Sequence, residues 1–193
     1  MSDNTVRTFI ALESSKELGN LLDDTIDKLV KKGFKATWTK TSAAHLTLVF
    51  LGDMSMKKIA EMAYKIGSRI SGFPTFIYNV SKVGYFEYNS LPRVIWLGVN
   101  GGPTLSGLYK EICKAITGTG INLKNEEFIP HISVGRMKFS PKDWKKILET
   151  ITFEPLSVGA SSVGIYSSTL TSDGPIYKKL YKVDFEGGVI ING

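Results

Sequence analysis

The stretch "HLTLVFLGD" at residues 45–53 shares a four-residue frame with "HISVGRM" at residues 131–137. In each stretch a histidine is followed by an apolar residue, a hydroxyl residue and a second apolar residue, and the chain has no other histidine. Both frames alternate polar and apolar residues, which is typical of a half-buried β-strand. Because residues i and i+2 of a strand point to one face, each frame is expected to present an imidazole and a hydroxyl together and to turn its apolar residues to a core.

The repetition of this frame favours a function over a structural role. Serine and threonine occupy 33 of the 193 positions, so two randomly placed histidines would both have a hydroxyl residue at i+2 about three times in a hundred. A single histidine in a sheet is more often structural than functional. Two matching frames therefore point to one shared site.

Strand and helix patterns alternate along the chain, and each histidine strand lies between two expected helices, so that the two halves look like loose copies. The sequence therefore predicts an α+β fold, with two pseudo-symmetric lobes of antiparallel sheet, helices packed outside and a central cleft. Neither a linker nor a low-complexity segment interrupts residues 1–193, which are expected to form a single bilobal domain. Helices are expected at residues 14–33, 55–70, 103–116 and 140–151, the last opening at Ser140-Pro141.

Composition indicates a cytoplasmic globular protein. The net charge of +6 gives a weak, salt-screened attraction for polyanions. The single cysteine, Cys113, has no partner for an internal disulfide, which fits a reducing compartment. No apolar run is long enough to span a bilayer, and the first residues lack the pattern of a signal peptide.

Two imidazoles and two hydroxyls suit in-line cleavage of a phosphodiester. One histidine can be neutral and take a proton from water, while the other is protonated and gives a proton to the leaving oxygen. The hydroxyls can hold the non-bridging oxygens. A zinc site is the weaker alternative, since catalytic zinc normally takes three protein ligands and neither frame offers a nearby Cys, Asp or Glu on the right face. We therefore expect no metal and no other cofactor.

Two H-x-[ST]-apolar motifs on strands in duplicated lobes resemble the two-histidine phosphoesterase superfamily, and most closely its RNA 2′,3′-cyclic phosphodiesterase (2′-5′ RNA ligase-like) family. Besides the two frames, the resemblance includes "RTFIALE" at 7–13, "PRVIWLGV" at 92–99 and "SSTLTSDGPIYKKL" at 167–180. It therefore covers essentially the whole chain.

The resemblance implies a role for each residue of the frames. His45 falls on the family's proton donor and His131 on its proton acceptor, while Thr47 and Ser133 take the hydroxyl positions in substrate binding. Ser133 departs from the commoner threonine but keeps the donor. Arg136 falls on the arginine that follows the second motif, a candidate phosphate clamp.

The same resemblance implies the substrate and the reaction. The partner would be an RNA bearing a 2′,3′-cyclic phosphate end, such as a tRNA-like fragment, opened to a 2′-phosphomonoester without a metal. No protein partner and no membrane are implied. Ligation of 2′-5′ bonds, cleavage of another small cyclic or 2′-5′ nucleotide, and a non-catalytic RNA-binding module stay open as alternatives.

Four aromatic residues near the motifs are harder to place from the sequence. Phe50 and Trp96 are expected in the core rather than as stacking platforms for nucleobases. Tyr177 is expected to be structural, and Trp38 to line the mouth of the cleft.

Overall fold

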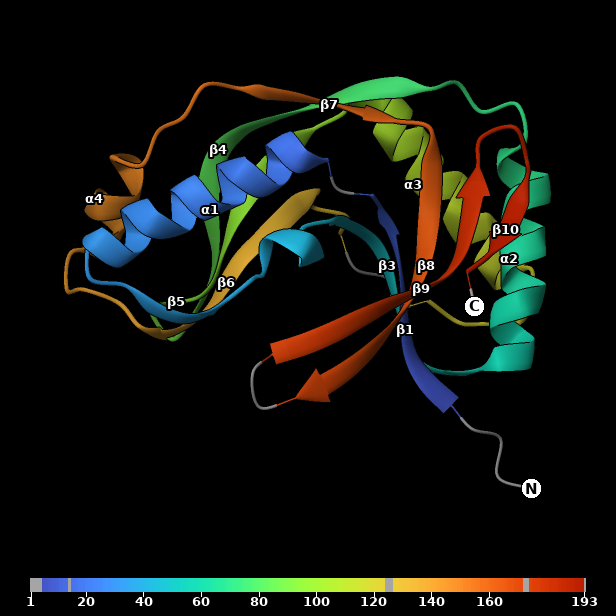
Figure 1. The fold of residues 1–193 in the computed structure, drawn as a ribbon, viewed down its shortest axis with the longest axis horizontal. Helices are drawn as coiled ribbons and strands as arrows, with labels where there is room; N and C mark the ends of the chain where they lie inside the picture. The colour runs from blue at the N-terminus through green and yellow to red at the C-terminus, as the bar shows by residue number, and fades with distance from the viewer. Residues whose placement is uncertain (1–4, 14, 124–126, 172–173, 193) are drawn as a thin grey trace.

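The computed structural model describes residues 5–13, 15–123, 127–171 and 174–192, and these fold into two five-stranded antiparallel sheets (Figure 1). The sheet of the first lobe has the order β10-β9-β8-β1-β3, and the sheet of the second lobe has the order β2-β6-β5-β4-β7. The strands are β1 (Thr5–Leu12), β2 (Lys35–Trp38), β3 (Leu46–Ser55), β4 (Phe76–Tyr88), β5 (Leu91–Asn100), β6 (His131–Phe139), β7 (Leu156–Ala160), β8 (Ser162–Thr171), β9 (Gly174–Asp184) and β10 (Val189–Ile191).

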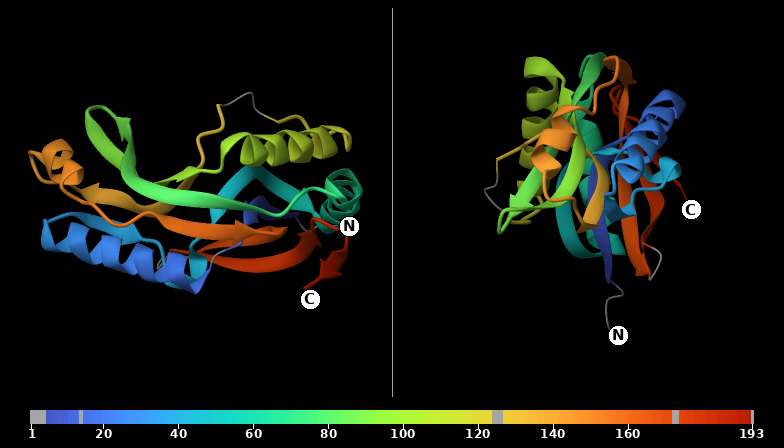
Figure 2. Two further views of the ribbon diagram at one scale, coloured as in Figure 1. Left: turned by 90° about the horizontal axis from the view of Figure 1, so that it is seen from above. Right: turned by 90° about the vertical axis from the view of Figure 1, so that its left-hand side faces the viewer.

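Helices lie on the outer sides of the two lobes, as the views from above and from the side show (Figure 2). They are α1 (Lys16–Lys31), η1 (Thr41–Ala43), α2 (Met56–Ile70), α3 (Gly102–Thr117) and α4 (Trp144–Glu149). Although α1 directly follows β1 of the first sheet, it packs against β6 and β7 of the second, and so ties the lobes together. The predicted fold is confirmed: two lobes of antiparallel sheet, with helices outside.

Local signals set most element ends, with two differences from the expected pattern. The helix expected from residue 14 begins after Ser15, whose hydroxyl caps α1 by accepting a hydrogen bond from Leu18 N, and Ser14 itself lies outside the described residues. Helix α4 is shorter than expected because Trp144 N donates to Pro141 O, which makes a three-residue turn before the helix begins. The connection between β4 and β5 is a tight turn, since Asn89 and Ser90 both have positive φ.

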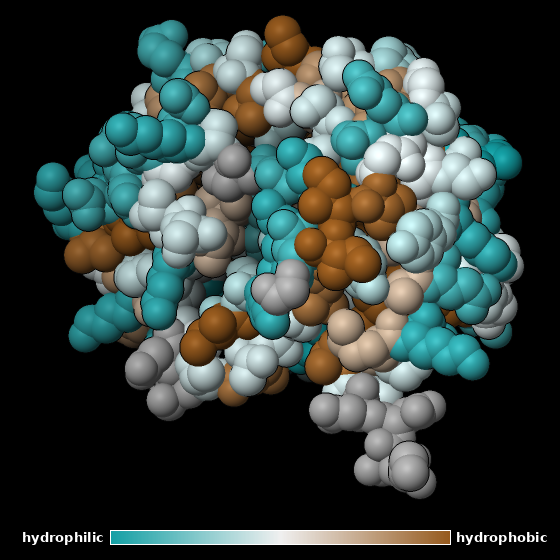
Figure 3. All heavy atoms as spheres, turned by 45° about the vertical axis from the view of Figure 1, so that its right-hand side comes forward, coloured by the Kyte–Doolittle hydropathy of each residue, from teal (hydrophilic) through white to brown (hydrophobic). Residues whose placement is uncertain are grey.

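The apolar residues of the two histidine frames are buried as predicted. Leu46, Leu48, Ile132 and Val134 all belong to the hydrophobic core, so the alternate residues of both strands are left for the opposite face. The surface shown in Figure 3 is mixed, with apolar side chains in small patches among polar ones. None of the helices in the described part of the chain is long and apolar enough to cross a bilayer.

Candidate active site

Strand β6 carries a bulge directly after the hydroxyl residue of its frame. Ser133 pairs with Trp96 of β5. Arg136, three residues further on, pairs with Val94, which is only two residues from Trp96. Paired residues of antiparallel strands project to the same face, so the extra residue of the bulge returns Arg136 to the face that carries His131 and Ser133. A regular strand would have turned the arginine away.

Strand β3 repeats this irregularity at the matching position. Thr47 pairs with Ala11 of β1, and Phe50, three residues on, pairs with Phe9, only two residues from Ala11. The bulge therefore brings Phe50 to the face of His45 and Thr47, and makes Phe50 the counterpart of Arg136 in the other lobe. The side chain of Phe50 is 68% exposed, so the expectation that Phe50 lies in the core is wrong.

Both imidazoles are held by the same kind of hydrogen bond. Nδ1 of His45 lies 2.7 Å from the carbonyl oxygen of Ala43, and Nδ1 of His131 lies 2.7 Å from that of Ile129. A carbonyl oxygen only accepts, so Nδ1 carries the hydrogen in each ring. Each neutral imidazole is therefore fixed in the tautomer whose Nε2 is free to accept a proton.

Aromatic rings enclose His45 on the side of the first sheet. Phe9 stacks on the imidazole at 4.8 Å between ring centroids, and Tyr166 lies 5.2 Å from Phe9 and 6.4 Å from the imidazole. Tyr177 of β9 meets His45 edge-on at 5.2 Å. Tyr177 thus contributes directly to the surroundings of this histidine, which its position in a strand pattern did not indicate.

A second aromatic group encloses His131. Phe86 meets the imidazole perpendicularly at 4.9 Å, and the Trp96 ring lies 6.1 Å away. The indole rests on Gly84, where an added Cβ would lie within 2.1–2.5 Å of the ring atoms. Only glycine leaves room for the indole at this point, so Trp96 flanks the histidine instead of filling the core.

Burial lowers the pKa of both imidazoles below its ordinary value of 6.5. The hydrogen bonds to Ala43 and Ile129 act in the opposite direction, because they favour the protonated rings. A charge on His131 lowers the pKa of His45 further. This electrostatic interaction, together with the contact of β3 with β6, indicates that the two frames lie close to each other where the lobes meet.

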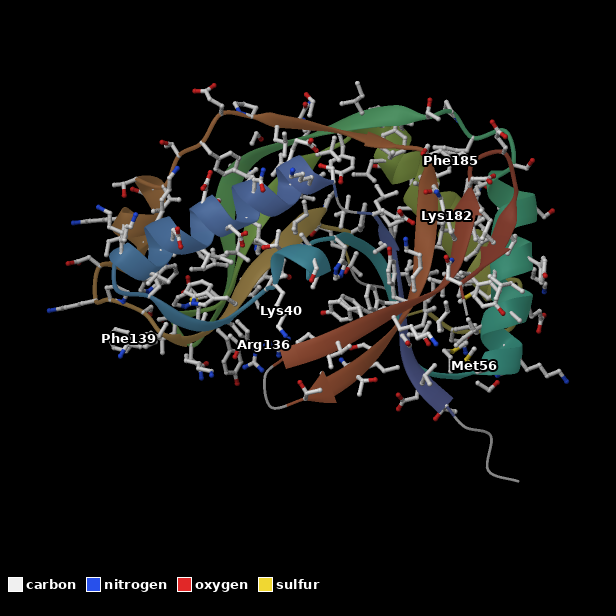
Figure 4. The ribbon with its side chains drawn as sticks, viewed as in Figure 1. Lys40, Met56, Arg136, Phe139, Lys182 and Phe185 are labelled. Atoms are coloured by element: carbon white, nitrogen blue, oxygen red, sulfur yellow. The ribbon has the colours of Figure 1, made fainter. Side chains whose placement is uncertain are left out.

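Two arginines approach Tyr177 from different lobes. Burial raises the pKa of the Tyr177 hydroxyl, and the charges of Arg136 and Arg7 lower it. Figure 4 shows Arg136 and Lys40 on the part of the second lobe that faces the β8–β9 hairpin. The end of this hairpin reaches β2, since a Cβ at Gly174 would lie 3.8 Å from the Thr37 methyl group.

Trp38 does not line this part of the cleft. Thr37 pairs with Arg136, whereas Trp38 pairs with Gly135 and therefore lies on the opposite face, packed against the core. The structure thus brings together all five residues singled out from the sequence, and adds Phe50, Tyr177 and Arg7. In the described ranges, no group of three or more His, Cys, Asp or Glu side chains could hold a metal ion.

Comparison with known proteins agrees with this architecture. A family model described as the 2′-5′ RNA ligase superfamily matches residues 21–170. The chain is 44% identical to the RNA 2′,3′-cyclic phosphodiesterase of Thermotoga maritima, over 96% of this chain and 98% of that protein. It is 33% identical to the protein of the same name from Aeropyrum pernix, over 81% of this chain and 90% of that protein.

Solved structures share the fold at lower sequence identity. E. coli LigT complexed with 3′-AMP matches with a TM-score of 0.72 and 23% identity, over 93% of this chain and 97% of that chain. TT0787 of Thermus thermophilus matches with a TM-score of 0.75 and 21% identity, over 94% of this chain and 98% of that chain. The chain therefore belongs to the 2′-5′ RNA ligase superfamily and, within these two-histidine phosphoesterases, to the family of the RNA 2′,3′-cyclic phosphodiesterases.

Proposed function

We propose that the protein hydrolyses 2′,3′-cyclic phosphate ends of RNA to 2′-phosphomonoesters, without a metal, using His45 and His131 as an acid–base pair. The observation that carries this proposal is the matched pair of 2.7 Å bonds from Nδ1 to backbone carbonyls. They leave two Nε2 atoms available across one cleft, one for each proton transfer of an in-line displacement. The family of the chain supports the substrate class.

The reaction needs one neutral and one protonated imidazole. Nε2 of neutral His131 takes a proton from water while the water oxygen forms a bond to phosphorus. The bond from phosphorus to O3′ breaks, and protonated His45 gives its proton to O3′, which leaves a 2′-phosphomonoester. Exchange of protons with solvent then restores both rings. The hydroxyls of Thr47 and Ser133 donate to the non-bridging oxygens, whose charge grows in the transition state.

The lowered pKa of both histidines predicts a bell-shaped pH dependence of kcat/KM. Its acidic limb is the protonation of His131, which must act as a base, and its alkaline limb is the deprotonation of His45, which must act as an acid. Because kcat/KM reports the free enzyme and both pKa values lie below 6.5 there, the optimum is expected on the acidic side of pH 6.5. Initial rates between pH 5 and 8 check this, and a flat profile would contradict it.

The profile of kcat should differ from that of kcat/KM. A bound phosphodiester is an anion, which favours the protonated form of a nearby imidazole and raises its pKa. The kcat optimum is therefore expected at a higher pH than the optimum of kcat/KM. The difference between the two pH optima separates the effect of burial on the histidine pKa values from the effect of the bound substrate on them.

Phe50 is placed to hold the base of the terminal nucleotide. Its ring projects on the same face as His45, is mostly exposed, and lies 6.2 Å from the Phe9 ring. An exposed aromatic ring accepts any base by stacking. We assign the terminal ribose to the His45 side of the cleft, since the leaving oxygen belongs to that ribose.

Arg136 is proposed to neutralise the cyclic phosphate, and Arg136→Ala is expected to lower kcat/KM about 10- to 100-fold. The estimate follows from the loss of one or two hydrogen bonds between charged groups, at about 1.5–3 kcal/mol. Lys146→Ala is the matched control, since it removes one positive charge from the exposed surface of α4 and should leave kcat/KM within twofold. If both substitutions lowered kcat/KM by the same factor, Arg136 would act only through the net charge of the protein.

A panel of phosphodiesters tests the proposed function. The purified protein is incubated with adenosine 2′,3′-cyclic phosphate, adenosine 3′,5′-cyclic phosphate and a 2′-5′-linked dinucleotide, and the products are identified by ³¹P NMR. We expect hydrolysis of the first compound to the 2′-phosphate. A 3′-phosphate product would contradict the roles assigned to the histidines. Cleavage of only the dinucleotide would mean that the substrates are 2′-5′-linked nucleotides and not cyclic phosphates. Binding of all three without turnover would leave a nucleotide-binding module.

A further inference from the structure

Arg7 lies in the row of residues next to the aromatic stack of His45. Arg7 and Phe9 are two residues apart on β1, and Phe9 is the ring that stacks on His45. Across the sheet, Arg7 pairs with Ser168 of β8, and Ser168 pairs with Tyr177 of β9. Arg7, Ser168 and Tyr177 therefore form one row on the cleft face of the first sheet.

The charge of Arg7 is available for a ligand. The chain has four arginines, and the charges of two of them, Arg7 and Arg136, lower the pKa of the Tyr177 hydroxyl. Arg7 is exposed, and none of the ion pairs found among the described residues involves it. The acid nearest to it in the sheet is Asp53, its cross-strand partner on β3. A guanidinium and a phenol hydroxyl in one row of the sheet offer several donors to the oxygens of one phosphate.

The spacing along β1 matches the repeat of a nucleic acid backbone. One step from residue i to i+2 of a strand covers about 6.6–6.8 Å. This step separates Arg7 from Phe9, whose ring stacks on the histidine assigned to the leaving oxygen. Adjacent phosphates of an extended single strand are separated by a similar distance. Phe50, the proposed base platform, pairs with Phe9 and lies one row from Arg7.

We propose that Arg7 and Tyr177 form a subsite for the phosphate on the 5′ side of the terminal nucleotide, so that the protein prefers RNA ends to cyclic mononucleotides. The inference rests on the proposed function of the cleft. With the cyclic phosphate between the histidines and the terminal base on Phe50, the 5′ phosphate reaches the row of Arg7. Asp53, the cross-strand partner of Arg7 on β3, is expected to weaken this subsite, because its negative charge competes with a phosphate for the guanidinium.

Two probes that differ by one group isolate this subsite. They are adenosine 2′,3′-cyclic phosphate with a free 5′-hydroxyl, and the same compound with a 5′-phosphate. Their Kd values are measured by calorimetry on His131→Ala, which should bind without turnover, and their kcat/KM values on the parent. We expect the 5′-phosphate to lower Kd about tenfold and to raise kcat/KM by a similar factor, as one charge-assisted contact would.

Three substitutions then identify the side chain responsible. Arg7→Gln should bring the Kd ratio of the two probes close to one, with less than a threefold change for the 5′-hydroxyl probe. Asp53→Asn should increase the ratio, because it removes the competing carboxylate. Lys178→Gln is the matched control: Lys178 adjoins Tyr177 but projects from the opposite face of the hairpin, so the ratio should stay as in the parent.

Each outcome bears on one proposal only. Equal Kd values for the two probes on a protein that carries Arg7 would overturn the subsite, whether or not the parent turns the probes over. A tenfold ratio that persists in Arg7→Gln would also overturn it. Absence of turnover by the parent, with a Kd ratio that depends on Arg7, would instead reject the proposed reaction and keep the subsite.

Discussion

His131→Ala is expected to lower kcat on an RNA 2′,3′-cyclic phosphate about 10²- to 10⁴-fold. General base catalysis contributes an acceleration of this size, and no other side chain of the frame can take the proton from water. The imidazole is partly exposed, while the core is made by its neighbours Ile132 and Val134. The variant should therefore keep its fold. Single-turnover rates at saturating enzyme give the loss in the chemical step.

Two further observations on His131→Ala separate catalysis from structure. The variant should melt within a few degrees of the parent by circular dichroism and bind the 2′-phosphate product with a similar Kd. Added imidazole should restore part of the rate, since it can occupy the space left by the side chain and accept the proton. An unfolded variant would assign His131 a structural role, and an unchanged rate would remove it from the reaction.

His45→Ala is expected to cause a comparable loss on RNA ends but a much smaller one on an activated ester. In the proposed mechanism His45 protonates O3′ as it leaves, whereas nitrophenolate leaves without a proton. The matched substrate is 3′-deoxyadenosine 2′-(4-nitrophenyl phosphate), in which nitrophenolate replaces O3′ on the same phosphorus and no neighbouring hydroxyl can attack. Comparing kcat/KM of His45→Ala with that of the parent on both substrates gives the two losses.

The same pair of substrates distinguishes the roles of the two histidines. His131→Ala should be slow on both compounds, because water must still be activated whichever group leaves. For His45→Ala, the loss of kcat/KM relative to the parent should be at least tenfold smaller on the nitrophenyl ester than on the RNA end. If the pattern were reversed, His45 would be the base and His131 the acid. Equal losses for both variants on both substrates would remove the division into donor and acceptor.

The repeated frame is the part of the site that the sequence predicted best. Alternation over four residues is a local property, and it correctly placed Leu46 and Ile132 in the core and the polar residues on the other face. The two-lobed sheet followed from the same repetition. The hydrogen bonds of the histidines to Ala43 and Ile129 are also local, but they depend on the backbone turn before each strand, which no residue type announced.

Other parts of the site depend on strand pairing and therefore could not be predicted from the sequence. A bulge is a mismatch between two strands, so the orientation of Phe50 and Arg136 is decided by β1 and β5 as much as by the motifs themselves. Tyr177 and Arg7 come from opposite ends of the chain and lie in one row only because β8 pairs with both β1 and β9. Their separate patterns read as ordinary strands.

The most direct test of the two-histidine reaction uses a short RNA that ends in a 2′,3′-cyclic phosphate. The parent, His45→Ala and His131→Ala are incubated with it in the presence of EDTA, and the ends are resolved by mass spectrometry and phosphatase sensitivity. We expect conversion to a 2′-phosphate by the parent and loss of conversion in both folded variants. Conversion that stops with EDTA, or that survives in either variant, would contradict a metal-independent reaction carried by two histidines.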